Sequence, residues 1–317
     1  MKKLLLLALL GALGTFLPMA QAAQENHGRI AFSSNRGNDP NVYDLWAVDP
    51  DGNNLTRLTN DQAFDLDAAW SPDGTTIAYA STKVDGNEHI FLMNPDGTNV
   101  RQLTAGNANE YQPAWSPDGH SIAFTSDRTG HPEIYVMHSD GSDVSQVTHT
   151  PDPELNHRAA FLDGDKIIYG HAPDANTFVG PFTMLTAHRN GTDAGDVTPA
   201  GLVAPDDPAV TMRAGHQVAF VDNFCSICDV SDVFTMNADG TNVRQLTSDF
   251  GNNLDPDWSP DGRAITFSHE DPPITFDHAD IWTMSADGSH LFNVTNNPAD
   301  DVEPAWGCPG KGGDCHS

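Results

Sequence analysis

Polar side chains recur at two fixed distances before the ends of six apolar segments. These segments end at Trp70, Trp115, Phe161, Met212, Trp258 and Trp306. The residues five positions earlier are Asp65, Glu110, Asn156, Asp207, Asn253 and Asp301. The residues three positions earlier are Asp67, Gln112, Arg158, Ala209, Asp255 and Glu303. If the six segments surround one axis, these side chains gather around it. A ring of carboxylate and amide oxygens suits calcium, magnesium or a basic peptide.

The sequence therefore predicts a ligand-binding site at the mouth of a central channel. Its expected residues are Asp65, Asp67, Glu110, Asn156, His157, Asp207, Asn253, Asp255, Asp301 and Glu303. The alternative is a hydrated polar lining without a ligand. Calcium is the one cofactor that we consider for the ring. The acidic segment DPDGNN at 49–54 resembles a calcium loop, but it lacks the later glutamate, and we interpret it as a turn.

The four cysteines offer a second chemistry. They are Cys225, Cys228, Cys308 and Cys315. An even number in an exported protein indicates disulfides, and four cysteines allow three connectivities. Pairing Cys308 with Cys315 would hold the end of the chain, and pairing Cys225 with Cys228 would close a small loop. The alternative is a zinc site in which Cys225 and Cys228 are joined by histidines of the segment 269–280.

Nucleophilic catalysis has little support in this sequence. There is no G-x-S-x-G turn, and scattered serine, histidine and aspartate residues do not define a catalytic triad. We therefore predict no catalytic residue and expect a non-enzymatic protein. A metal-assisted hydrolase or lyase that uses the channel mouth stays an alternative, as does a propeller that calcium only stabilises.

The segments that would position the ring belong to an internal repeat. Three copies read DAAWSPDGTTIAYAS (67–81), PAWSPDGHSIAFTS (113–126) and DPDWSPDGRAITFS (255–268). A less regular copy lies at 158–170, and a terminal copy lies at 302–310. Each continues with a third apolar segment, a tight turn and a short segment that ends in L-T or V-T. Apolar segments bounded by such turns every dozen residues or fewer indicate antiparallel four-stranded units.

Six copies of each segment predict an all-β fold, a six-bladed β-propeller. The aromatic residues of the third segments are Trp46, Phe91, Tyr135, Phe182, Phe234 and Trp282. The fourth segments end at Leu58, Leu103, Val147, Val197, Leu246 and Val294. We interpret the aromatic residues as packing between blades. The fourth repeat, 165–215, is the least regular and lacks the Asp-Gly turn.

The order of the segments predicts how the ring closes. The first repeat begins with a second strand at 29–32, and the chain ends with a spare first strand at 302–306. Pairing these two segments in one blade would leave no free sheet edge. We expect function on the face that carries the loops entering each first strand, because those loops are long and variable.

The amino terminus has the pattern of a secretory signal peptide. Lys2 and Lys3 precede an apolar run, which Ala20-Gln21-Ala22 follows. We predict a signal peptide at 1–22 and one propeller domain at 23–317, with repeats at 29–310 and a tail at 311–317. The alternative is a membrane anchor, but the apolar run is short, and no later stretch is long enough to span a bilayer. The expected location is the periplasm or the exterior of the cell.

The composition limits the partners. The formal net charge is −29 at pH 7, so the chain repels the phosphates of nucleic acids. The remaining interpretations are a cation, a basic protein surface or a salty environment. We expect a monomer without a membrane span after cleavage.

The repeated motifs W-S-P-D-G, I-A-F/Y-x-S and D-G-x-N-x-x-x-L-T resemble the propeller repeats of the TolB family over residues 29–310. The resemblance implies a periplasmic propeller that binds an envelope protein or peptide, such as a lipoprotein. TolB also has an amino-terminal α/β domain, whereas only residues 23–28 separate the expected cleavage site from the first repeat here. Related repeats accompany the hydrolase domain of prolyl-oligopeptidase-like enzymes and occur in oligogalacturonate lyases.

Overall fold

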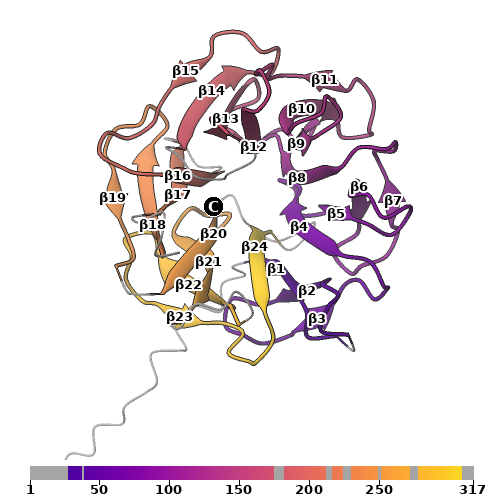
Figure 1. Cartoon of the computed structure of the whole chain (residues 1–317). Helices are drawn as coiled ribbons and strands as arrows, with labels where there is room; N and C mark the ends of the chain where they lie inside the picture. Colours follow the sequence, from indigo (N-terminus) through magenta and orange to yellow (C-terminus); the bar gives the residue numbers. More distant parts are fainter. Residues whose placement is uncertain are drawn as a thin grey trace, which may run out of the picture.

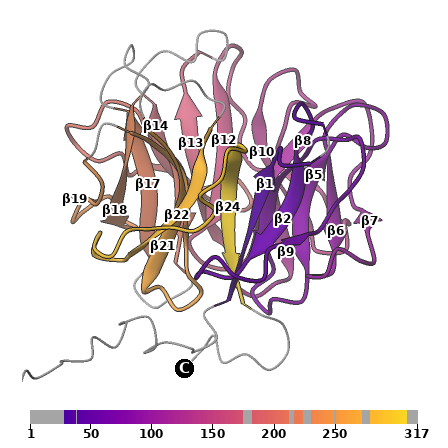
Figure 2. The same ribbon diagram turned by 90° about the horizontal axis from the view of Figure 1, so that it is seen from below.

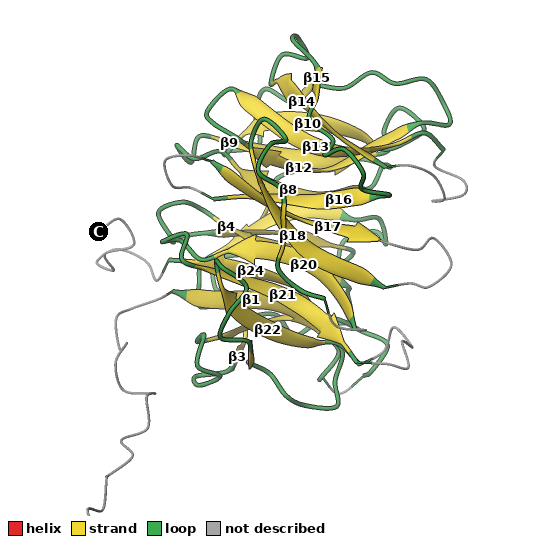
Figure 3. Ribbon diagram, turned by 90° about the vertical axis from the view of Figure 1, so that its left-hand side faces the viewer, coloured by secondary structure: helices red, strands yellow, loops and turns green. Residues whose placement is uncertain are grey.

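Strands make up all the regular structure that a computed structural model of the chain describes. It describes residues 28–37, 39–174, 182–211, 216–223, 230–248, 251–271 and 278–308. In these ranges, six four-stranded antiparallel sheets form a ring, and there is no helix (Figures 1 and 3). The predicted six-bladed propeller is confirmed. No helix that could cross a membrane occurs in the same ranges, and the expected signal peptide lies outside them.

The strands of each blade run from the axis outward. The innermost strands are β4 (Asp65–Trp70), β8 (Glu110–Trp115), β12 (Leu155–Phe161), β16 (Pro205–Val210), β20 (Asn252–Trp258) and β24 (Asp301–Gly307). The second strands are β5 (Ile77–Ser81), β9 (Ser121–Ser126), β13 (Lys166–Ala172), β17 (Gln217–Asn223), β21 (Ala264–Glu270) and β1 (Arg29–Ser34). The third strands are β6 (His89–Met93), β10 (Glu133–His138), β14 (Thr183–His188), β18 (Ser231–Asn237), β22 (Asp280–Ser285) and β2 (Asp44–Val48). The outer strands have two residues each and are β7 (Arg101–Gln102), β11 (Ser145–Gln146), β15 (Gly195–Asp196), β19 (Arg244–Gln245), β23 (Phe292–Asn293) and β3 (Thr56–Arg57).

One blade is assembled from both ends of the sequence. Its order is β24-β1-β2-β3, so the last strand of the chain is the innermost strand beside the first (Figure 2). Arg29 lies opposite Gly307, and Ser34 lies opposite Asp301. The predicted closure is confirmed.

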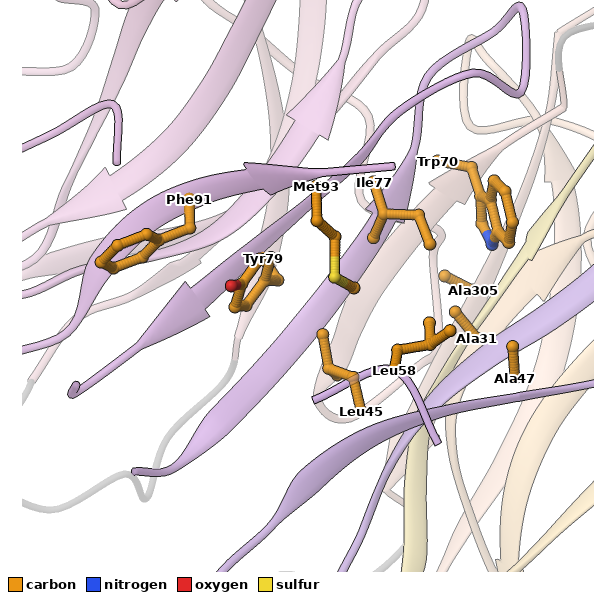
Figure 4. Packing of buried hydrophobic residues seen from close by; sticks show 10 residues of the cluster. All are labelled: Ala31, Leu45, Ala47, Leu58, Trp70, Ile77, Tyr79, Phe91, Met93 and Ala305. Carbon is orange, nitrogen blue, oxygen red and sulfur yellow. The ribbon is translucent and has the colours of Figure 1, made fainter. Parts of the chain in front are cut away.

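Neighbouring blades pack large side chains against small ones. In β5, Ile77 and Tyr79 point to one face and belong to one apolar cluster with Ala31 and Leu45 of the preceding blade (Figure 4). Ala78 points to the other face and packs against Phe124 of the next blade. Because side chains alternate along a strand, the repeated I-A-F/Y pattern makes one face of each blade bulky and the other recessed. Each of the six apolar clusters in the described ranges joins two neighbouring blades.

The L-T and V-T pairs tie the third strand to the outer strand. In every blade, the threonine hydroxyl accepts a hydrogen bond from a third-strand backbone N–H at 2.9 to 3.0 Å. These threonines are Thr59, Thr104, Thr148, Thr198, Thr247 and Thr295. The hydroxyl thus satisfies a backbone donor where the outer strand ends after two residues.

The fourth repeat and the start of the fifth differ from the prediction. β16 ends at Val210, not at Met212, which lies outside the described residues. Asp207 is therefore three positions before the strand end, where we expected Ala209. In β14, Leu185 pairs with Tyr169 and takes the place that we gave to Phe182. The fourth repeat also has a tight turn, because the backbone N–H of His188 bonds the carbonyl of Thr192 across Asn190-Gly191.

Deleting residues 301–317 should expose an edge on β1. The truncated protein would lack β24, so the backbone groups of Arg29–Ser34 that pair with it become a template for aggregation. We expect loss of cooperative thermal unfolding and high-mass species in size-exclusion chromatography. Deleting only residues 309–317 is the control and should have neither effect. A soluble 301–317 deletion with unchanged melting would contradict closure by β24.

Candidate functional site

Each innermost strand contains one residue that departs from regular β geometry. Its φ lies between 50 and 54°, and it stands where the register with the second strand shifts. Such a bulge breaks the alternation of side chains and redirects one of them. We call these residues the axial ring: Asp67, Gln112, Arg158, Asp207, Asp255 and Glu303.

The axial ring is one end of a cavity of about 340 Å³ on the propeller axis. From the ring, the lining follows all six innermost strands toward the turns that carry the S-P-D-G words. Pro72, Pro117 and Pro260 of those turns line its other end. The cavity therefore lies on the turn side of the ring, whereas we expected the site on the face with the longer loops.

Hydrogen bonds link ring residues of successive blades. Glu303 Oε2 accepts a hydrogen bond from the backbone N–H of Asp67 at 3.0 Å. Asp67 Oδ2 accepts one from the N–H of Gln112 at 3.1 Å. Gln112 Oε1 accepts one from the N–H of Arg158 at 3.1 Å. Each side chain in this series is thereby held by the backbone of the next blade.

Arg158 connects the series to the opposite side of the ring. Its Nε lies 2.6 Å from Asp207 Oδ1, and its Nη1 lies 2.8 Å from Asp255 Oδ1. Burial acts to lower the pKa of Arg158, but the carboxylates of Asp207, Asp255 and Asp67 outweigh it and raise the pKa well above its usual value. The ring thus sets four carboxyl groups against one guanidinium, so it is negative when they ionise.

Three ring carboxyls titrate near neutral pH. Burial, with repulsion from Asp67 and Asp255, raises the pKa of Glu303 to about 8. Burial likewise raises the pKa of Asp207 to about 7 and that of Asp67 to about 6, although Arg158 opposes both shifts. The part of these shifts that comes from repulsion between carboxylates would be relieved by a cation bound at the ring.

A histidine–aspartate pair adjoins the ring on the side away from the cavity. His157 Nε2 lies 3.3 Å from Asp206 Oδ1, and each residue directly precedes a ring residue. Burial acts to lower the pKa of His157, but the charge and hydrogen bond of Asp206 raise it. A Cβ at Gly170 would lie 2.3 Å from Asp206 Oδ1, so a larger residue there would displace this pair. The other innermost strands have Leu66, Tyr111, Leu254 and Val302 at this position.

Five predicted site residues lie inside the blades and do not line the cavity. They are Asp65, Glu110, Asn156, Asn253 and Asp301, all at most 2% exposed. Asp301 accepts hydrogen bonds from Ser34 Oγ at 2.5 Å and from the Arg36 guanidinium. Glu110 forms ion pairs with Arg128 at 3.2 Å and with His89 at 2.8 Å, the latter when the imidazole is protonated. Asn156 and Asn253 likewise donate hydrogen bonds inside the blades, so four of the five residues have internal partners.

Asp65 is less well satisfied than its counterparts. In this blade, Lys83 stands at the position equivalent to Arg36. Its ammonium group donates to the Tyr79 hydroxyl and lies 3.9 Å from the Phe91 ring centroid. Both carboxylate oxygens of Asp65 are buried without a hydrogen bond of acceptable geometry. Burial raises the pKa of Asp65, although the hydroxyls of Ser81 and Thr59 oppose the shift.

The prediction of site residues missed Gln112, Arg158 and Asp257. The first two stood three positions before strand ends, but their residue types did not suggest cation ligands. Asp257 stands one position before Trp258 in the cavity wall, and its Oδ2 accepts the N–H of Trp306 at 2.7 Å. Burial raises its pKa to about 7. The other five innermost strands have alanine at this position. The aspartate in DPDW was therefore the feature of the sequence that could have identified Asp257.

The cysteine predictions fall mostly outside the described residues. Cys308 is buried at the end of the cavity lining and is not a free thiol. Cys225, Cys228 and Cys315 lie outside the described ranges, so the disulfide pairing and the zinc alternative stay predictions. Within those ranges, no three histidine, cysteine or acidic residues converge as a metal site.

Comparisons with known proteins agree on the type of propeller. Residues 80–192 match the family model described as the TolB beta propeller domain. The Tol-Pal system protein TolB of Francisella tularensis is 29% identical over 250 residues, which are 77% of this chain and 54% of that protein. This chain thus spans about half the length of the curated relatives that it matches.

Solved structures resemble this chain in fold. TolB from Acinetobacter baumannii gives a TM-score of 0.71 at 22% identity, over 89% of this chain and 67% of that one. Kuenenia stuttgartiensis hydrazine synthase gives a TM-score of 0.68 at 15% identity, over 89% of this chain and 47% of that one. At these identities, the likeness shows the architecture alone.

Replacing Asp301 or Asp65 with asparagine should have opposite consequences for stability. Asp301→Asn leaves the partly buried Arg36 guanidinium without its buried carboxylate partner, and we expect a loss of about 3 kcal/mol. Asp65→Asn removes a buried carboxyl that lacks good partners, so we expect unchanged or higher stability at pH 7. Denaturant unfolding of the two variants measures the difference, and equal losses would show that Asp65 is as well paired as Asp301.

The ring should make the protein less stable as the pH rises from 5 to 8. A carboxyl whose pKa is raised in the folded state binds more protons there than in the unfolded chain, so its stabilising effect is lost as pH approaches the folded value. For Glu303 that value is about 8. We expect Glu303→Gln to flatten the dependence of the melting temperature on pH, and parallel profiles for the two proteins would contradict it.

Proposed function

The chain is a TolB-type β-propeller, and we propose that it is a non-enzymatic module that binds a protein or peptide in the cell envelope. The observation that carries this proposal is the axial ring. It sets four carboxyl groups against one guanidinium at the inner end of a cavity large enough for a side chain. A positively charged group of a partner would enter this cavity and neutralise the ring.

The geometry favours a charged side chain over a bare metal ion as the occupant. The ring oxygens come from different blades, and several already accept backbone N–H groups. In the described ranges, no three ligand residues converge on one point, as calcium requires. An ammonium or guanidinium group needs fewer and more widely spaced acceptors. We therefore propose calcium, the cofactor expected from the sequence, only as a weaker competitor for the ring.

The proposed location rests on the sequence. The pattern at residues 1–22 supports export, and the even number of cysteines supports an oxidising compartment. We propose the periplasm as the compartment, two structural disulfides, and an envelope protein, such as a lipoprotein, as the partner. The name of the Francisella relative, a Tol-Pal system protein, supports an envelope role.

Calorimetric titration of short peptides tests this function. We expect a basic peptide to bind and an acidic peptide of equal length not to bind. The double variant Asp67→Asn/Glu303→Gln should weaken binding by about tenfold or more, because it removes two of the carboxylates that face the charge. Calcium should compete with the basic peptide more strongly than sodium at equal ionic strength.

A matched control separates the ring from the general acidity of the protein. Asp143→Asn/Asp193→Asn also removes two carboxyl groups, from side chains that are 77% and 80% exposed. It should leave affinity nearly unchanged, since exposed charges are screened. If both double variants lose affinity equally, or if the acidic peptide binds as well as the basic one, the ring is not the binding site.

A further inference from the structure

We infer that the axial cavity receives one lysine side chain of the bound peptide, inserted from the face of the S-P-D-G turns. This inference rests on the proposed function and names the group that is recognised, the side of entry and the depth that it reaches.

The cavity is layered in the way that a lysine side chain is built. The axial ring provides acidic acceptors at the inner end. The positions directly after the ring are alanine or proline, and the positions after those are alanine in five blades and Asp257 in the sixth. The outer layer is apolar and consists of Trp70, Trp115, Phe161, Val210, Trp258 and Trp306. Lysine has a charged tip on an aliphatic stem, so its polarity follows this order.

The length of the cavity matches the same side chain. Trp70 comes three positions after Asp67, which is ~10 Å along a strand. An extended lysine reaches ~6 Å from Cα to Nζ, as four carbon–carbon bonds and one carbon–nitrogen bond allow. A hydrogen bond adds ~3 Å. A peptide backbone beside the tryptophans would therefore place Nζ at the ring.

The arrangement of the acceptors favours an ammonium over a guanidinium group. Asp67 and Glu303 belong to adjacent blades and approach the axis from different directions. An ammonium presents three donors around one point, whereas a guanidinium presents its donors in one plane. Arg158 already makes the planar contact, to Asp207 and Asp255. The acceptors that remain suit lysine.

Two buried donors in the outer layer lack acceptors. The indole N–H groups of Trp70 and Trp258 have no hydrogen-bond partner in the described ranges. Their side chains are only 8% and 4% exposed, and both residues line the cavity. Figure 4 shows the Trp70 indole beside Ala305 in this wall. The equivalent indole N–H of Trp115 donates to the backbone carbonyl of Ala69 in the neighbouring blade at 3.1 Å. Trp70 and Trp258 lack such a bond, and a peptide carbonyl at the depth of this layer would supply an acceptor.

Among the described residues, the cavity does not extend past the ring to its other side. The residues directly before the ring include Leu66, Tyr111 and the paired His157 and Asp206, and none of them lines the cavity. The ring is therefore its inner end, and entry is from the turns at Pro72, Pro117 and Pro260.

End-blocked peptides Gly-Gly-X-Gly-Gly test the inference, with X as lysine, arginine, norleucine or Nε-acetyl-lysine. We expect the lysine peptide to bind about tenfold more tightly than the two uncharged peptides, as charge-assisted hydrogen bonds provide. It should also quench tryptophan fluorescence. Asp67→Asn/Glu303→Gln should remove the preference for lysine.

Two variants test the side of entry. Pro260→Trp should obstruct the entrance and weaken binding of the lysine peptide. Val84→Trp, at a position 58% exposed in the β5–β6 loop on the opposite face, is the matched control and should not. Cooperative melting verifies folding, and Pro117→Trp replaces Pro260→Trp if that variant does not fold.

The outcomes separate the two proposals. Equal or tighter binding of the arginine or norleucine peptide, with the ring still required for basic peptides, would overturn the lysine inference and leave the binding function standing. Obstruction by Val84→Trp but not by Pro260→Trp would overturn the side of entry. Failure of every basic peptide to bind would overturn both.

Discussion

One backbone constraint connects the fold to the site: each innermost strand passes through a bulge whose first residue has positive φ. For residues other than glycine, this conformation costs roughly 1–2 kcal/mol. Glycine would avoid that cost, yet the six positions hold aspartate, glutamine, arginine or glutamate. In the consecutive series from Glu303 to Arg158, the side-chain oxygen accepts the N–H of the next bulge. The hydrogen bonds offset the strain, so the polar character of the ring is part of the architecture itself.

The blades are joined by two kinds of contact at different distances from the axis. Farther out, apolar side chains of neighbouring blades pack together, as Ile77 and Tyr79 do in the cluster that contains Ala31 and Leu45. At the axis, polar side chains bond the neighbouring backbone. The apolar contacts hold the strands in place, so the ring is organised before any ligand arrives. A site organised in this way loses little conformational entropy on binding.

The repeat made the architecture predictable, whereas the bulge made the site hard to predict. Turn motifs that recur at a nearly constant spacing identified six blades and their closure, because a turn is specified by the few residues that form it. In a regular strand, Asp65 and Asp67 lie on the same face, so both were expected at the axis. The bulge between Leu66 and Ala69 separates them, which sends Asp67 to the cavity and Asp65 into the blade. Nothing in the local residue types marks that shift.

Asp207 shows a related limit. The apolar Met212 suggested a strand end two residues too late, and only the pairing of Ala209 with Ala219 fixes the register. The side of the cavity was also hidden from the sequence, because it depends on which side chains converge behind the ring. Asp257 was visible as the one acid among five alanines, but its meaning required the cavity wall to be known.

The seam between β1 and β24 determines how the ring responds to mechanical load. Arg29 and Gly307 lie opposite each other at the same end of this antiparallel pair. Tension that draws these two points apart acts first on their own hydrogen bonds and then on each following pair in turn. The strands would peel at low force instead of resisting together in shear. A pulling force on the chain beyond Arg29 or Gly307 therefore acts directly on the β1–β24 pair that closes the ring.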